Sequence, residues 1–276
     1  MLAAFLITFR EGLEAALIIS IVTGYLVKIG QPRLIRTAWA GAGAAGVISV
    51  LTAVVIMAIG AELEGTAEQI FEGTTMFLAV AVLTWMIFWM RTQARLIKQT
   101  LEREVLSAVT TGTAWGLFGL TFVAVVREGV ETALFLSASA FLADGLTTLA
   151  GAGLGLAAAA VTGYLLYAST ARLNVRAFFD VTSLLLLFFA AGLLGHGVHE
   201  FQEAGLLPLT IEHLWDINFI LSETSPLGEI LKALFGYNGN PSLLEVLSYA
   251  SYWVVTLLGV RWWVERRAAP VSALPR

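Results

Sequence analysis

Two short charged stretches interrupt apolar parts of the chain in the same pattern. The stretch "REGLEAALIIS" at residues 10–20 returns as "REGVETALFLS" at residues 127–137, with seven of eleven positions identical. In a helix, the two glutamates of each copy are three residues apart and the arginine precedes the second by four, so its guanidinium can pair with a carboxylate. Carboxylate oxygens are hard ligands suited to hard metal cations. The expected metal-binding residues are therefore Glu11, Glu14, Glu128 and Glu131, with Arg10 and Arg127 as supporting ion-pair partners.

The composition indicates that these charges belong to a membrane protein. Of the 276 residues, 58% are hydrophobic and 13% are charged, and the mean hydropathy is +0.82. Soluble domains carry about 25% charged residues, and their helices have polar faces that these segments lack. The chain contains no cysteine, which excludes disulfides, thiolate metal sites and cysteine nucleophiles. The sequence therefore predicts an all-α polytopic (multi-pass) membrane protein.

Seven segments are long and apolar enough to cross a hydrocarbon layer of about 30 Å. The first lacks the basic start of a secretory signal and is therefore expected to be a retained span. Thirteen of the sixteen lysines and arginines fall in the loops after spans one, three and five and in the C-terminal tail. By the positive-inside rule, this places the N-terminus outside and the C-terminus inside. The seven expected transmembrane helices are residues 1–28, 38–60, 73–91, 110–140, 148–170, 178–197 and 246–264.

The doubled motif lies on the first and fourth spans, which cross the membrane in opposite directions. A charged side chain near the bilayer centre costs from about 2.5 kcal/mol upward, so the same three charges on two spans indicate a shared function. Two antiparallel three-span units form an inverted repeat, which is typical of secondary transporters. Buried ion pairs that brace the two spans are the structural alternative. The expected organisation is a single permease domain, 1–276, with repeats at 1–91 and 110–197, an external loop at 198–245 and a seventh span at 246–264.

On this doubled motif the chain resembles the high-affinity iron permease family (the iron/lead transporter family), whose members carry an Arg-Glu-x-x-Glu motif in the first and fourth of seven spans. "REGLE" at 10–14 and "REGVE" at 127–131 match it residue for residue, and length, span number and orientation resemble the bacterial EfeU-type branch. The resemblance implies import of ferrous or ferric iron, as substrate rather than bound cofactor, across the bacterial cytoplasmic (inner) membrane. It implies periplasmic or membrane-associated partners that deliver iron or set its redox state. It also implies that the ion is bound by Glu11, Glu14, Glu128 and Glu131.

Further polar groups outside the motifs are candidates for roles in the same transport. "GHGVHEFQE" at 195–203 is a candidate external site that captures iron, and the alternative is an interfacial helix end whose polar groups face water; its potential ligands are His196, His199, Glu200 and Glu203. Asp180, near the inner end of the sixth span, is a candidate for exit or proton coupling. The loop at 198–245 is expected to form short helices at the membrane interface. The glycine- and alanine-rich second and fifth spans are expected to be close-packing surfaces.

Other functions fit the sequence less well. The same fold moving manganese or lead is the closest competitor, because carboxylates discriminate poorly among divalent cations. A membrane diiron enzyme would need Glu-x-x-His elements, and a seven-helix photoreceptor would need a lysine in its last span; the chain has neither. We therefore expect a permease in contact with membrane lipid, not an enzyme, with no nucleic-acid partner. The sequence leaves the oxidation state of the iron, the driving force and the oligomeric state open.

Overall fold

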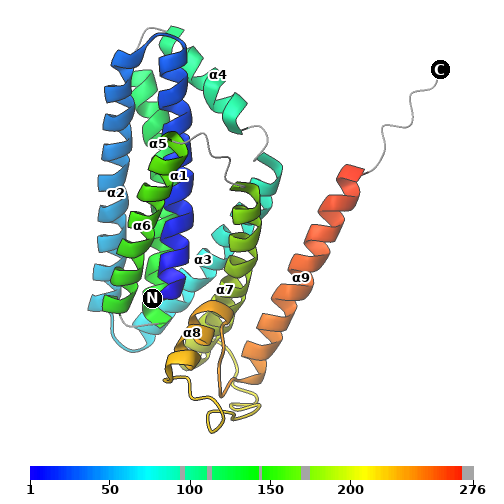
Figure 1. The fold of residues 1–276 in the computed structure, drawn as a ribbon. Coiled ribbons are helices and arrows are strands. Elements are labelled where there is room, and N and C mark those ends of the chain that lie inside the picture. The colour runs from blue at the N-terminus through cyan, green and yellow to red at the C-terminus, as the bar shows by residue number, and fades with distance from the viewer. Residues whose placement is uncertain (94–96, 111–113, 143–144, 169–174, 269–276) are drawn as a thin grey trace, which may run out of the picture.

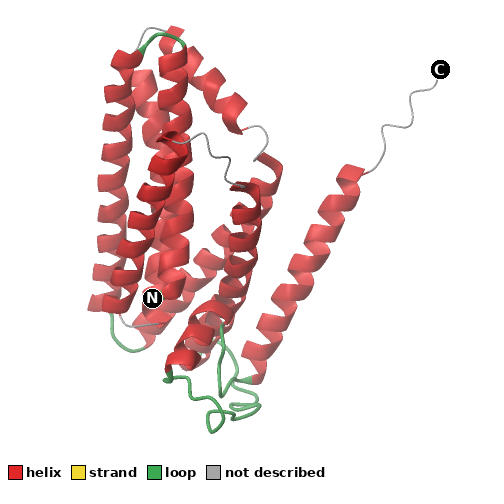
Figure 2. Cartoon of the chain, viewed as in Figure 1, coloured by secondary structure: helices red, strands yellow, loops and turns green. Residues whose placement is uncertain are grey.

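The structure, a computed structural model, describes residues 1–93, 97–110, 114–142, 145–168 and 175–268, and every regular element among them is a helix (Figure 2). This confirms the all-helical class. Seven long helices overlap the expected spans, although residues 111–113 and 169–170 of those spans lie outside the described part. The helices are α1 (Leu2–Lys28), the short η1 (Pro32–Leu34), α2 (Ile35–Glu62), α3 (Thr66–Gln93), α4 (Ile97–Thr110), α5 (Ala114–Leu142), α6 (Gly145–Ala168), α7 (Val175–Glu203), α8 (Pro226–Phe235) and α9 (Leu243–Ala268).

Several of these helices have the length and composition of membrane spans. α1 and α5, at 27 and 29 residues, each carry the three charges of a motif near the middle, and such charges oppose insertion into a bilayer. α9 contains a shorter apolar stretch, Leu243–Gly259. Four other segments are long and apolar enough to cross a membrane: Pro32–Glu62, Thr66–Met90, Gly145–Leu165 and Phe178–Glu203.

The helices pair in such a way that each pair has a counterpart when the two halves of the chain are exchanged (Figure 1). α1 packs against α6, α2 against α5, and α3 against α7, while α1 and α5 contact each other. Exchanging α1, α2 and α3 for α5, α6 and α7 leaves this set of pairs unchanged. α8 and α9 pack on α7, and α4 contacts α1 and α5. The two helices that carry the motifs are therefore brought together inside the bundle.

Glycines set how closely α2 and α6 approach the motif helices. A Cβ atom at Gly41 of α2 would lie 2.6 Å from the carbonyl oxygen of Phe118 on α5. A Cβ atom at Gly151 of α6 would collide with the carbonyl group of Met1, at the start of α1. Both are the first glycine of an "AGAG" stretch. The close packing expected of the glycine-rich second and fifth spans is confirmed at these positions.

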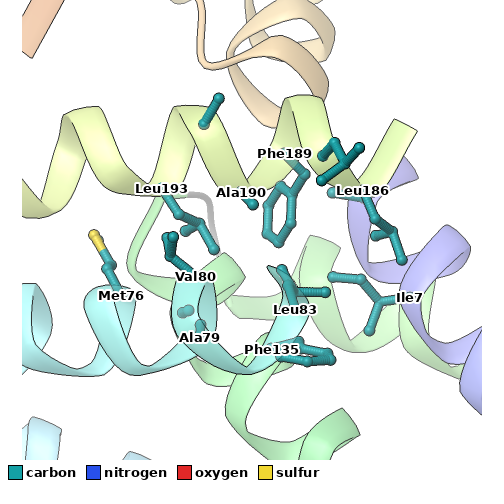
Figure 3. Close-up of a cluster of buried hydrophobic side chains, with 14 of the residues drawn as sticks. Ile7, Met76, Ala79, Val80, Leu83, Phe135, Leu186, Phe189, Ala190 and Leu193 are labelled. Carbon is teal, nitrogen blue, oxygen red and sulfur yellow. The ribbon is translucent and has the colours of Figure 1, made fainter. Parts of the chain in front are cut away.

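Two hydrophobic clusters lie on either side of the first motif. The larger cluster joins α3 and α7 with Ile7 of α1 and Phe135 of α5, both fully buried (Figure 3). The smaller cluster joins Ile18 and Val22 of α1 with Leu101 of α4. Ile7 precedes the charged residues of α1 and Ile18 follows them. The first motif is therefore held between two apolar cores.

The segment expected to link the third and fourth spans contains a helix that the sequence analysis did not predict, α4 at Ile97–Thr110. Its sequence, "IKQTLEREVLSAVT", mixes charges with Leu101 and Val105, whose side chains are buried. These two residues are four apart and share one face of the helix. Residue 110, the expected first residue of the fourth span, belongs to α4, and the described part of the next long helix is Ala114–Leu142.

The segment between α7 and α9 contains one helix and a series of turns. α7 continues to Glu203, beyond the expected end of the sixth span at residue 197. α8 begins after Ser225, whose hydroxyl accepts a hydrogen bond from the Gly228 amide, and ends at Gly236 in the left-handed conformation (φ 66°). Such a hydroxyl cap and such a glycine are the usual ends of a helix. The expected helical structure in this loop is therefore represented by α8.

Replacing Gly41 by alanine should destabilise the protein by about 1–3 kcal/mol, because the added methyl group would overlap the Phe118 carbonyl oxygen and push α2 from α5. Gly43→Ala is the matched control on the same helix, since nothing lies within 4 Å of a Cβ atom there and alanine forms helices better than glycine. Thermal unfolding in detergent should show a lower Tm for Gly41→Ala and an unchanged or higher Tm for Gly43→Ala. Equal Tm values for the two variants would contradict this packing.

Candidate metal centre

The motif carboxylates of α1 and α5 converge inside the bundle. One carboxylate oxygen from each of Glu11, Glu128 and Glu131 lies within 4.8 Å of the other two. Glu11 and Glu128 are buried, and Glu131 is partly buried. Glu14 is buried as well, but its carboxylate is not part of this group of three. Two helices that are far apart in the sequence thus bring together oxygen ligands of the type that binds hard cations.

Arg10 bridges the two glutamates of its own motif. Its Nη1 lies 2.9 Å from Glu11 Oε1, and its Nη2 lies 3.1 Å from Glu14 Oε1. The side chain of Arg10 has no exposed surface. Burial of a guanidinium is tolerated only where carboxylates balance its charge, and here two of them do so. Arg10 and the two glutamates of the first motif therefore form one ion-pair network around a fully buried guanidinium.

Arg127 makes the corresponding contacts in a more open position. Its Nε lies 3.4 Å from Glu128 Oε1 and 3.1 Å from Glu131 Oε1. In contrast to Arg10, its side chain is 41% exposed. The guanidinium also lies over the ring of Trp89 on α3, 4.3 Å from the ring centroid, which is a favourable cation–π position. Arg127 is therefore accessible where Arg10 is enclosed.

α3 holds Arg10 as well, through two methionines that the sequence analysis did not single out. Arg10 Nη1 donates to Met86 Sδ at 3.2 Å, and Nη2 donates to Met90 Sδ at 2.9 Å. Thioether sulfur is a weak acceptor, and within the described chain the Nε of Arg10 has no hydrogen-bond partner. Met86, Trp89 and Met90 lie at the i, i+3 and i+4 spacing of one helix face. This spacing was the sequence signal for these contacts, but it lies within an apolar span and was not noticed.

Each of the four motif glutamates keeps one buried carboxylate oxygen that makes no hydrogen bond to the described residues. Glu14 Oε1 does approach Arg10 Nη2, but not in hydrogen-bonding geometry. A buried carboxylate oxygen without a partner destabilises the protein, and a bound cation would remove that penalty. The four oxygens are Glu11 Oε2, Glu14 Oε1, Glu128 Oε2 and Glu131 Oε2.

A cavity of about 1600 Å³ reaches the motifs from one side. Glu14, Arg127 and Glu128 are part of its wall, together with residues of α3, α4 and α7. Glu11 and Glu131 do not line it. The site therefore borders open space at Glu14 and Glu128 and is enclosed by protein at Glu11.

The glycine of each motif faces a neighbouring helix. A Cβ atom at Gly12 would lie 2.9 Å from Ala159 Cβ on α6, and a Cβ atom at Gly129 would collide with Ser49 on α2. Both glycines therefore permit close helix packing beside the glutamates. Ala159 and Ser49 stand at the same place relative to the "AGAG" stretches of α6 and α2.

The sequence of the chain matches a known protein family. The profile of the family described as "Iron permease FTR1 family" matches residues 1–270. The chain belongs to this family. This membership confirms the expected family. It also confirms the expectation that the protein is an iron permease and not an enzyme. No solved structure matches the chain.

Three relatives show how far the likeness of this iron permease to other proteins extends. It is 41% identical over 261 residues to "Ferrous iron permease EfeU" of Escherichia coli O6:H1 (strain CFT073), with 94% of each chain covered. The identity to the protein of the same name from Escherichia coli O157:H7 is also 41%, with the same coverage. The Yersinia pestis protein of this name is 37% identical over 94% of this chain and 92% of its own. The likeness thus extends over nearly the full length of each protein.

The histidines at the end of α7 are distributed over separate contacts in this permease. His196 is hydrogen-bonded through its Nδ1 to the Gly192 carbonyl, at 3.0 Å. His199 lies 3.2 Å from Glu203 through Nε2 and 3.2 Å from Glu245 of α9 through Nδ1. Glu200 is partly buried and makes no ion pair within the described residues. The structure links His199 to Glu203 but does not gather all four residues, and their capture role stays a prediction.

Glu245 is a residue that the sequence analysis missed. It accepts hydrogen bonds from the Ser242 amide at 3.1 Å and from Asn238 Nδ2 at 2.7 Å, in addition to its contact with His199. The contact with His199 ties the start of α9 to the end of α7. Because His199 and Glu245 lie 46 residues apart in the chain, no local sequence pattern could have identified their contact.

Arg10→Gln should destabilise this permease more than Arg127→Gln does. Removing the buried guanidinium would leave Glu11 and Glu14 without their charge partner, a change that typically costs about 3–5 kcal/mol. Arg127 is partly exposed, so its ion pairs are screened by solvent and we expect a loss of about 1 kcal/mol. Thermal unfolding of the two purified variants checks the difference. A larger fall in Tm for Arg127→Gln would contradict the described burial.

Proposed function

We propose that this chain imports iron, as the ferrous ion, across the bacterial cytoplasmic membrane through a site formed by Glu11, Glu14, Glu128 and Glu131. The observation that carries the proposal is the set of four buried carboxylate oxygens without hydrogen bonds, one from each glutamate. Membership of an iron permease family supports iron as the substrate. The relatives named as ferrous iron permeases support the ferrous form.

The charge of the site also favours a divalent ion. With four glutamates and two arginines ionised, the site carries four negative and two positive charges, a formal charge of −2. One ferrous ion would neutralise this charge, whereas one ferric ion would leave an excess of +1 in a poorly solvated environment. The charge of the site thus fits one divalent ion, and the family supports iron as that ion, bound as transported substrate.

Seven helices serve as membrane spans in this proposal, with the N-terminus outside and the C-terminus inside. They are α1, α2, α3, α5, α6, α7 and α9, and the shortest, α6, has 24 residues. A helix of that length extends about 36 Å, more than the hydrocarbon thickness of about 30 Å. The distribution of lysine and arginine over the loops supports the orientation.

An inverted repeat of α1–α3 and α5–α7 accounts for the packing. The set of helix pairs is unchanged when the two halves are exchanged. The motif glycines behave alike as well, since Gly12 meets α6 and Gly129 meets the corresponding position of α2. Rocking of two such halves about a central site is the usual way in which repeat transporters expose that site to each side in turn.

The two arginines have different roles in the proposed cycle. Arg10 is enclosed and keeps part of the negative charge of the first motif compensated at all times. Arg127 is partly exposed and stacks on Trp89. Its guanidinium can therefore move away from Glu128 and Glu131 while it stays in contact with open space. We expect arrival of the ion to displace Arg127 from these carboxylates. Delivery of the iron by a periplasmic or membrane-associated protein stays a prediction.

Iron uptake by cells that lack other importers tests the proposal. Glu14→Gln and Glu131→Gln should each reduce uptake of radioactive iron by a factor of about ten or more, since a lost charge–charge interaction of 1.4 kcal/mol already gives tenfold. Glu64→Gln is the matched control, because Glu64 is exposed in the turn between α2 and α3. Uptake should increase with ascorbate, which keeps iron ferrous, and manganese and lead serve as competitors.

The uptake measurement requires equal amounts of each variant in the membrane. If Glu14→Gln and Glu131→Gln imported iron as fast as wild type and Glu64→Gln, the motifs would be braces between helices and the ion path would lie elsewhere. If manganese or lead competed better than iron, the substrate would have to be revised.

A further inference from the structure

The cavity beside the motifs extends from the carboxylates to the end of the molecule that carries α4. Glu14 and Glu128 line its inner part; they are only 8% and 4% exposed, and each has a buried oxygen without a hydrogen bond. Glu104 of α4 and Asp180 of α7 line the same cavity. Its volume of about 1600 Å³ would accommodate roughly fifty waters at about 30 Å³ each. The buried carboxylates thus share one continuous space with two further acids.

The opposite side of the motifs is closed by protein. Ile7 lies one turn before Glu11 on α1, and Phe135 lies one turn after Glu131 on α5. Both are fully buried in the larger hydrophobic cluster, together with Leu83 of α3 (Figure 3). Because α1 and α5 run in opposite directions in the proposed repeat, these positions lie on the same side of the glutamates. An ion held by the carboxylates therefore has an open route on one side only.

The open side is the end at which α1 finishes and α5 begins. The cavity wall includes Leu17 and Ile21, which follow the first motif, and Leu120 and Ala124, which precede the second. α4 covers this end by burying Leu101 against α1. In the proposed orientation this end faces the cytoplasm. The inference that follows therefore rests on the proposed function.

We propose that this cavity is the water-filled exit path of the permease, and that Glu104, assisted by Asp180, receives the cation after it leaves Glu14 and Glu128. Neither Glu104 nor Asp180 makes an ion pair or hydrogen bond within the described part of the chain, so both charges are available to a passing cation. Their attraction acts across a cavity with apolar walls, where it is stronger than in bulk water. As the ion departs, Arg127 pairs again with Glu128 and makes its return unfavourable.

The absence of cysteine from the chain allows the path to be mapped with single cysteines. Ala124→Cys lies in the cavity wall, and Ala138→Cys is its control on the same helix, fully buried in the larger hydrophobic cluster. In inside-out vesicles, a charged, membrane-impermeant thiol reagent should modify Ala124→Cys at least about tenfold faster than Ala138→Cys, because only hydrated thiols ionise and react readily. Lys28→Cys and Glu212→Cys, both at exposed positions, mark the two sides of the membrane.

Two outcomes of the labelling would overturn the exit path. Reaction of Ala124→Cys with a lipid-soluble maleimide but not with the charged reagent would show that lipid fills the cavity. Reaction from the side on which Glu212→Cys reacts would show that the cavity opens outward. Either result would leave the proposed function intact if uptake still depended on Glu14 and Glu131.

A double variant tests the role of the two acids. Glu104→Gln combined with Asp180→Asn should lower the initial rate of iron uptake about tenfold, as expected for a loss of about 1.4 kcal/mol of attraction. The affinity for ferrous iron, measured by titration of the purified protein, should not change. Glu102→Gln, on α4 but outside the cavity wall, should behave as wild type. Wild-type uptake by the double variant, or a loss of its iron affinity, would overturn the assignment of Glu104 as the exit carboxylate.

Discussion

The energetic penalty of holding carboxylates inside a membrane protein determines how this molecule is built. Four glutamates and two arginines lie on α1 and α5, and each would oppose insertion if it faced lipid. α1 and α5 must therefore face each other, with α6 and α2 packed against them closely enough that glycines are needed at the contacts. The arginines compensate only half of the negative charge. The remaining negative charge is what we propose a divalent cation balances.

The environment of the two motifs is unequal although their sequences are nearly the same. Arg10 is enclosed and held by Met86 and Met90, whereas Arg127 is partly exposed and rests on Trp89. All three partners belong to α3, which thus acts on both halves of the site. In the proposed transport cycle, unequal surroundings of the two repeats are useful, because one conformation can expose the site to only one side of the membrane. Here the cavity lies on the side of α4, and the hydrophobic cluster of α3 and α7 closes the other.

Much of this arrangement could be predicted from the sequence, since it depends on local patterns. Apolar length indicated the long helices, and the doubled charges indicated which two had to meet. The helix α4 was missed because charged residues lie among its apolar residues, and this mixed composition resembles that of a loop. The contacts of Met86, Trp89 and Glu245 were missed because their partners lie far away in the chain. The difference between Arg10 and Arg127 follows from tertiary packing, which nearly identical local sequences cannot encode.

The most direct test of the central claim is X-ray absorption at the iron edge of the purified permease loaded with ferrous iron. We expect one ion per chain with an oxygen ligand shell, and loss of that bound ion when Glu11, Glu14, Glu128 and Glu131 are all replaced by glutamine. Iron bound with the same stoichiometry and the same ligand shell in the fourfold variant would contradict it. The motifs would then hold the helices together, and the ion site would have to be found elsewhere.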